Sequence, residues 1–186
     1  MTNKNSIFVS FLLILSLCLI TTMPTTSSAE SDPTGNISVH IVPTRFGATG
    51  GRSIEVADPS QHFYVVLTNA GKAPVRLWRE WCSWGYFNLS FVTKDQHGAI
   101  VKIVKHERAW DKNYPDWTIV SPGESMVVEV TFDKSAWNDA PLPEAGTNRS
   151  MELTAVFEIP NSPEAKTNGV WTGRVTSAAN TYTLYR

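Results

Sequence analysis

The stretch Trp78-Arg-Glu-Trp-Cys-Ser-Trp-Gly-Tyr-Phe-Asn-Leu-Ser-Phe91 holds three of the seven tryptophans of the chain and ends in an alternating pattern. Phe87, Leu89 and Phe91 occupy every second position, so in an extended strand they share one face, which we expect to point inward. Cys82 is the only cysteine of the chain beyond its first thirty residues. We therefore expect apolar packing, with aromatic rings as a large part of it, to hold the fold together.

The same alternation recurs along the chain from about residue 37. Apolar residues stand at every second position in several segments, and Gly, Pro, Asn and Asp separate these segments at short intervals. The rows expected to face inward lie at 37–41, 63–67, 87–91, 101–103, 126–132 and 153–159, with shorter strands at 54–56, 75–77, 170–176 and 181–185. No helical stripe of useful length accompanies them. The pattern predicts an all-β fold, an antiparallel immunoglobulin-like β-sandwich of about eight to ten short strands, with a jelly roll as the alternative.

Turn residues give the chain a resemblance to a known family. Asn69-Ala-Gly-Lys-Ala-Pro74 follows one predicted strand, Asp95-Gln-His-Gly98 follows another, and Ser121-Pro-Gly-Glu-Ser125 precedes a third. In this order the segments resemble bacterial extracellular immunoglobulin-like modules, and among named families the chain is most similar to the BsuPI-type proteinase-inhibitor domain. The resemblance implies a β-sandwich and an inhibitory activity. It lies in turns rather than in site residues, and the Trp-rich segment departs from the family.

Residues 1–29 are predicted to be a signal peptide. Lys4 precedes an apolar run from Ile7 to Ile20, and small residues end the segment at Ser27-Ser-Ala29, as cleavage by a signal peptidase requires. The apolar run is shorter than a membrane-spanning helix. The alternative is a lipoprotein signal that acylates Cys18. Either signal implies export, so we expect a secreted or periplasmic protein.

Residues 30–186 are predicted to form a single domain. Removing the leader takes away one of 16 Lys and Arg residues and none of 17 Asp and Glu residues, so the formal net charge becomes 15 − 17 = −2. This balance does not favour binding to nucleic acid. No second apolar segment is long enough to span a bilayer. A chain of this length buries about two thirds of its unfolded surface, enough for a core that needs neither disulfide nor metal.

Signals of catalysis or metal binding are weak. The four histidines lack the spacing of a metal site, and the chain has neither a glycine-rich phosphate loop nor a nucleophile elbow. Cys82 has no histidine at the spacing of a copper site, so we expect a buried, inert thiol. The alternatives for Cys82 are an intermolecular disulfide and a role as ligand or nucleophile. We predict no cofactor and no enzymatic activity, with a hydrolase of unrecognised site as the alternative.

Aromatic side chains are the candidate binding residues. Alternation from Leu77 and Leu89 places Trp78 outward, and it places Trp81 in the core. Exposed rings give contact area at low entropy cost, so they form a platform for sugars or a peptide. The predicted platform comprises Trp78, Trp84, Tyr86, Trp110, Tyr114 and Trp117. The alternative is that residues 82–85 bend the chain and fold these rings over the sandwich edge as a second small core.

These patterns favour a binding or assembly role with an unknown protein or glycan partner. One alternative is a carbohydrate-binding module that uses the surface aromatics. The other is a proteinase inhibitor that acts through an exposed loop, at 106–117 or 134–150, because long loops at the ends of a sandwich are where such folds carry function.

Overall fold

In a computed structural model of the chain, residues 37–56, 61–94 and 97–186 are described. The predicted signal peptide and Cys18 lie outside these ranges. The prediction of an all-β fold is confirmed, because the described residues form strands and turns with two helices of only four and five residues. No helix in these ranges has the length and apolar character needed to cross a bilayer.

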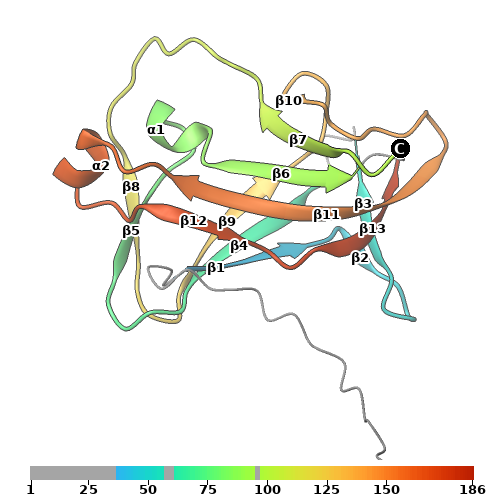
Figure 1. Cartoon of the computed structure of the whole chain (residues 1–186), viewed down its shortest axis with the longest axis horizontal. Coiled ribbons are helices and arrows are strands. Elements are labelled where there is room, and N and C mark those ends of the chain that lie inside the picture. Colours follow the sequence, from blue (N-terminus) through green and yellow to red (C-terminus); the bar gives the residue numbers. More distant parts are fainter. Residues whose placement is uncertain (1–36, 57–60, 95–96) are drawn as a thin grey trace, which may run out of the picture.

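The described strands form two sheets and a separate two-stranded ladder (Figure 1). The smaller sheet is built, in this order, from β1 (Ile37–Val42), β4 (Phe63–Asn69) and β9 (Ser125–Val130). The ladder joins β5 (Val75–Trp78) to β8 (Trp117–Val120). The larger sheet comprises, in spatial order, β10 (Trp137–Asn138), β7 (Ile100–Lys105), β6 (Leu89–Lys94), β11 (Asn148–Ile159), β13 (Asn180–Tyr185), β3 (Arg52–Glu55) and β2 (Arg45–Phe46), and β12 (Gly173–Thr176) also pairs with β11.

The longest strand, β11, is the centre of the larger sheet. It spans twelve residues and pairs with β6 along one edge. Along its other edge it pairs first with β13, where Met151 lies opposite Tyr182, and then with β12, where Phe157 lies opposite Val175. The helix α2 (Pro163–Thr167) connects β11 to β12.

Two details of the predicted sandwich are wrong. The described residues contain thirteen strands rather than eight to ten, because the prediction did not include β8 and because alternation cannot reveal the two-residue strands β2 and β10. The arrangement is also not purely antiparallel, since β13 pairs with β3 in parallel. The strands β6 and β7 pair antiparallel, with Lys94 opposite Ile100.

Aromatic rings fill the space where the two sheets face each other. Phe63 of β4 and Phe91 of β6 come from opposite sheets, and their ring centroids lie 5.7 Å apart. Phe132 packs against both of these rings at 5.0 Å. Trp137 of β10 closes the cluster 5.4 Å from Phe91. Each such edge-to-face pair contributes about 1 kcal/mol beyond the burial of its area.

The Trp-rich segment leaves the strand pattern between β5 and β6. A turn follows Trp78, and α1 (Ser83–Tyr86) follows the turn. Phe87, predicted to face inward, is exposed because it ends this helix and precedes β6, so the period of two does not yet apply to it.

Gly85 permits the tight return of the chain at α1. A Cβ atom at this position would lie 2.0 Å from the main-chain oxygen of Arg79. No other residue fits this contact without moving the turn, so the glycine fixes how closely α1 approaches the end of β5.

A turn at Ser121-Pro-Gly-Glu124 sets the start of β9. The Ser121 N–H donates to Glu124 Oε2 at 2.9 Å, and this hydrogen bond lowers the pKa of the Glu124 carboxyl. The Glu124 main-chain oxygen accepts from the N–H of Asn69 at 3.0 Å. The turn therefore fixes the register of β9 against β4.

Candidate functional site

A cleft of about 420 Å³ runs beside β9, which is the last strand of the smaller sheet. Leu89 of β6 and Phe157 of β11 give it an apolar lining, while the turn after β5 contributes a more polar wall. We call this cavity the edge cleft. Its lining includes Arg79, Glu80, Trp81, Leu89, Lys105, Met126, Val127, Val128, Glu129 and Phe157. Its volume lies in the usual range of ligand pockets.

Trp81 is the most exposed tryptophan at the edge cleft. Its side chain was expected in the core but is 58% exposed. The indole N–H donates to Asp116 Oδ2 at 2.5 Å, and the Arg79 guanidinium lies 4.8 Å from the ring centre. The expectation failed because residues 79–82 form a turn, to which strand alternation does not apply. These contacts hold the exposed ring in one place.

Three residues of the predicted platform form an inner cluster instead. Trp78 is only 2% exposed, so its predicted outward orientation is wrong. Trp84 lies 5.9 Å from Trp78 and Trp117 lies 6.0 Å from it, and both are partly buried. Residues 82–85 bend the chain, as the alternative interpretation required. The inner cluster is therefore mainly a packing feature.

Tyr86 and Trp110 form a second, more open aromatic pair. Their ring centroids lie 5.6 Å apart in an edge-to-face arrangement. Lys105 Nζ lies 4.6 Å from the Tyr86 ring centre, and the Arg108 guanidinium lies 4.4 Å from that of Trp110. Because Lys105 also lines the edge cleft, this pair borders the cleft.

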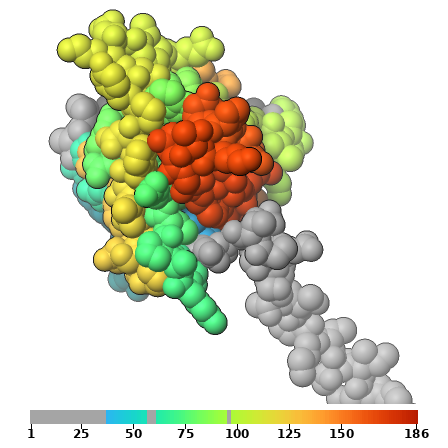
Figure 2. Space-filling view, turned by 90° about the vertical axis from the view of Figure 1, so that its left-hand side faces the viewer, coloured from blue at the N-terminus to red at the C-terminus, as the bar shows by residue number. Residues whose placement is uncertain are grey.

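The connection from β7 to β8, residues 106–116, projects from the body of the molecule (Figure 2). Asn113 anchors it through two hydrogen bonds to Ser83, at 2.6 and 2.9 Å. Asp116 anchors it through Trp81. Tyr114 lies between these anchors, is 75% exposed and makes no ring contact with another aromatic residue of the described chain. The structure thus divides the six predicted platform residues among three places.

Charged groups around the edge cleft pair with one another. Lys105 Nζ lies 3.0 Å from Glu80 Oε2, and Arg79 Nε lies 3.8 Å from Asp116 Oδ1. Sequence reasoning missed Arg79, Glu80 and Lys105, because charged residues in turns or at strand ends carry no signal of their own. The pairing leaves the cleft nearly neutral, with apolar surface between the pairs.

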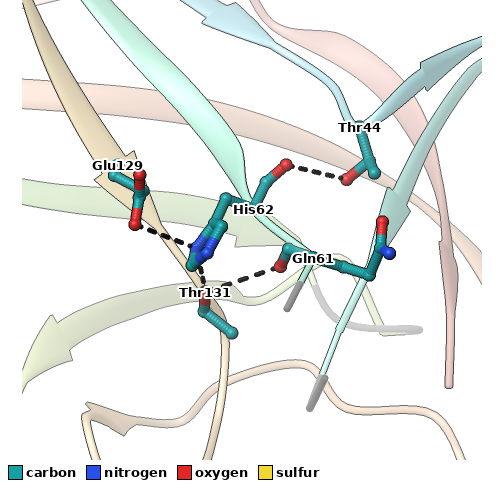
Figure 3. A network of polar contacts seen from close by, with 5 residues as sticks. All are labelled: Thr44, Gln61, His62, Glu129 and Thr131. Carbon is teal, nitrogen blue, oxygen red and sulfur yellow. Dashed lines mark hydrogen bonds and ion pairs between the residues drawn. The ribbon is translucent and has the colours of Figure 1, made fainter. Parts of the chain in front are cut away.

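A polar network centred on His62 joins the residue before β4 to Glu129 of β9 and to Thr131, which follows β9 (Figure 3). His62 Nδ1 lies 2.8 Å from Thr131 Oγ1 and 3.3 Å from Glu129 Oε1. A catalytic relay needs the hydroxyl and the carboxylate on opposite nitrogens of the imidazole ring. Here both contacts fall on the same nitrogen, so the network joins β4 to β9 rather than forming a relay.

Cys82 is buried, as predicted. Its Sγ donates to the main-chain oxygen of Arg79 at 3.2 Å, at the N-terminus of α1. Within residues 37–56, 61–94 and 97–186, no group of three or more His, Cys, Asp and Glu side chains has the geometry to hold a metal ion.

Comparisons of the chain with models of protein families, with curated proteins and with solved structures found no match. The resemblance to the BsuPI-type domain therefore stays a prediction. The edge cleft and the aromatic residues beside it are the features on which a function can be based.

Proposed function

We propose that the protein is an exported, non-enzymatic binding domain with an immunoglobulin-like β-sandwich fold, and that its ligand occupies the edge cleft. The observation that carries the proposal is the exposed Trp81 ring, fixed by Asp116 and Arg79 at the wall of an apolar cleft. A fixed, exposed tryptophan gives a ligand a large contact area without the cost of ordering the side chain.

The immunoglobulin-like fold is supported by the two sheets that face each other across the Phe63, Phe91 and Phe132 rings. The binding role is supported by the position of the cleft beside β9, where the exposed Trp81 and Val127 side chains are among the lining residues.

A proteinase inhibitor is the second candidate, favoured by Tyr114. This exposed side chain stands on a loop that is anchored on both sides, by Asn113 and by Asp116. An inhibitory loop needs such a fixed backbone around a protruding side chain.

The first prediction tests the binding role of the edge cleft. The full chain, purified after export, is screened on a glycan array and against a phage library of random dodecapeptides. Trp81→Ala is expected to reduce the affinity for any selected ligand at least tenfold, because loss of a central aromatic contact costs about 2 kcal/mol of binding free energy. The affinity is measured by calorimetry.

Phe46→Ala is the matched control. Phe46 is also an exposed aromatic residue, at 65%, and lies on β2 at the opposite end of the larger sheet from β10. The Phe46→Ala variant should bind the selected ligand with an affinity within twofold of that of the unaltered chain. Ligands insensitive to Trp81→Ala, or no ligand in either screen, would contradict the proposal. Inhibition of a serine proteinase panel that is lost in Tyr114→Ala but retained in Trp81→Ala would support the inhibitor instead.

A further inference from the structure

We propose that the ligand of the edge cleft is an extended polypeptide segment, which adds to the free edge of β9 as an antiparallel or parallel fourth strand of the smaller sheet. The inference rests on the proposed binding function and specifies its ligand class. It concerns the main chain of β9 rather than the aromatic rings near it.

The position of the cleft along β9 is the first step. Met126, Val127, Val128 and Glu129 are consecutive in the strand, and all four line the cleft. Successive side chains of a strand point to opposite faces of the sheet, and in β9 they alternate between buried or partly buried and exposed. A cavity that touches both sets lies at the edge of the strand, not over one face.

The direction of the main-chain groups is the second step. The Glu124 oxygen points to β4, because it accepts from the N–H of Asn69. In an antiparallel pair the direction alternates with each residue, so residues 126, 128 and 130 point to β4. Val127 and Glu129 therefore direct their N–H and C=O groups away from β4. In the described chain β9 pairs with β4 alone.

The spacing of these groups selects the ligand class. Val127 and Glu129 present two N–H and two C=O groups about 6.8 Å apart, the repeat of a β-strand. An extended polypeptide satisfies this pattern with its own main chain, as in other cases of strand addition. Exposed edges of this kind are a common site of pairing with another chain.

The side chains around the edge indicate which segment fits. Leu89 and Phe157 line the cleft with apolar surface, so every second residue of the segment should be apolar. The nearby charges are paired with each other, as in Lys105 with Glu80 at 3.0 Å and Arg79 with Asp116 at 3.8 Å. A charged residue at the centre of the segment would lack a partner, so the segment should be uncharged there.

The test uses a peptide selected from the dodecapeptide library and measures amide hydrogen exchange by NMR. Binding is expected to slow exchange of the Val127 and Glu129 amides at least tenfold, because these N–H groups acquire acceptors. The Val128 amide should change little, because it already donates to β4. Unchanged Val127 and Glu129 amides in the saturated complex would overturn strand addition.

Two substitutions test the same contact by affinity. Val127→Pro removes an N–H that β4 does not use, and an edge strand tolerates proline on its outer side. It is expected to reduce peptide affinity at least tenfold, whereas Val127→Thr, which keeps the N–H, stays within twofold. If circular dichroism shows that Val127→Pro does not fold, the hydrogen bonds are tested from the peptide side. The peptide is N-methylated either at its odd-numbered or at its even-numbered residues, and one of these two versions is expected to lose affinity at least tenfold.

The outcomes separate this inference from the proposed function. A Trp81-dependent glycan, with no peptide selected, would overturn strand addition and leave the binding role intact. Strand addition would also be overturned, and the binding role left intact, by a peptide that depends on Trp81 but loses no affinity in Val127→Pro or on N-methylation of either set of alternate residues. If neither screen gives a ligand, both proposals fail.

Discussion

At the scale of single residues, the site depends on close packing around the turn after β5. Trp81 is exposed because Asp116 and Arg79 hold its ring outside, while its neighbour Cys82 is buried against the Arg79 main chain. Adjacent residues thus face opposite environments without any strand alternation. The turn must stay fixed for the wall of the edge cleft to exist.

Gly85→Ala tests this packing. The added methyl group would meet the Arg79 oxygen at 2.0 Å, so we expect a loss of about 2 to 3 kcal/mol in unfolding free energy, measured by urea denaturation. Gly51→Ala is the control, because open space surrounds a Cβ atom there, and it should shift stability by less than about 1 kcal/mol. Equal stability of the two variants would show that the turn adapts freely.

At the scale of elements, alternation predicted strands well and turns poorly. The rows in β4 and β11 were placed correctly, since both strands have paired neighbours on each edge and one face on the core. The prediction for Trp78 was wrong because Trp84 of α1 and Trp117 of β8 cover its ring, so that Leu77 and Trp78 are both buried at the end of β5. The prediction for Trp81 was wrong because this residue lies in the turn after β5, where alternation does not apply. No local signal in the sequence could show that β9 has a free edge, since edges are set by long-range pairing.

The short strand β10 depends on a turn built by Asp133. Its Oδ1 accepts from the N–H groups of Ser135 at 2.7 Å and Ala136 at 2.9 Å. Partial burial raises the pKa of the Asp133 carboxyl. These two hydrogen bonds and the one from the Ser135 hydroxyl together lower it by more, so the pKa of Asp133 lies below the ordinary value. The stabilisation is therefore fully present above the unfolded pKa of about 3.9 and is lost as pH falls through the folded pKa.

Asp133→Ala should consequently be more harmful at neutral than at acidic pH. We expect a loss of about 1 to 2 kcal/mol at pH 7 and a much smaller one near pH 2, from urea unfolding followed by tryptophan fluorescence. Asp111→Ala, which removes an exposed carboxylate, serves as the control and should change stability little at either pH. A loss of the same size at both pH values would contradict the role of the charged carboxylate.

At the scale of the whole molecule, the predicted export determines which form of the chain would meet the ligand. The predicted leader carries Lys4, the apolar run and Ala29 at the expected cleavage position. The smaller sheet begins at Ile37, only a few residues beyond Ala29. The predicted cleavage after Ala29 would therefore leave every described strand intact.

Mass spectrometry of the exported protein tests the leader. We expect a mature chain of 186 − 29 = 157 residues that begins at Glu30. Ala29→Leu places a bulky residue at the cleavage position and should leave the precursor uncleaved, whereas Thr22→Leu, within the leader but outside the cleavage position, should be processed normally. A lipid-modified N-terminus at Cys18 would support the lipoprotein alternative instead.

The central place of β11 has a consequence for synthesis. Its partners on one edge, β12 and β13, follow it in the chain, and its partner on the other edge, β6, is made more than fifty residues earlier. The larger sheet therefore cannot close until β13 has emerged from the ribosome. Such late closure would keep the growing polypeptide open, which is the state that export of an unfolded chain would require.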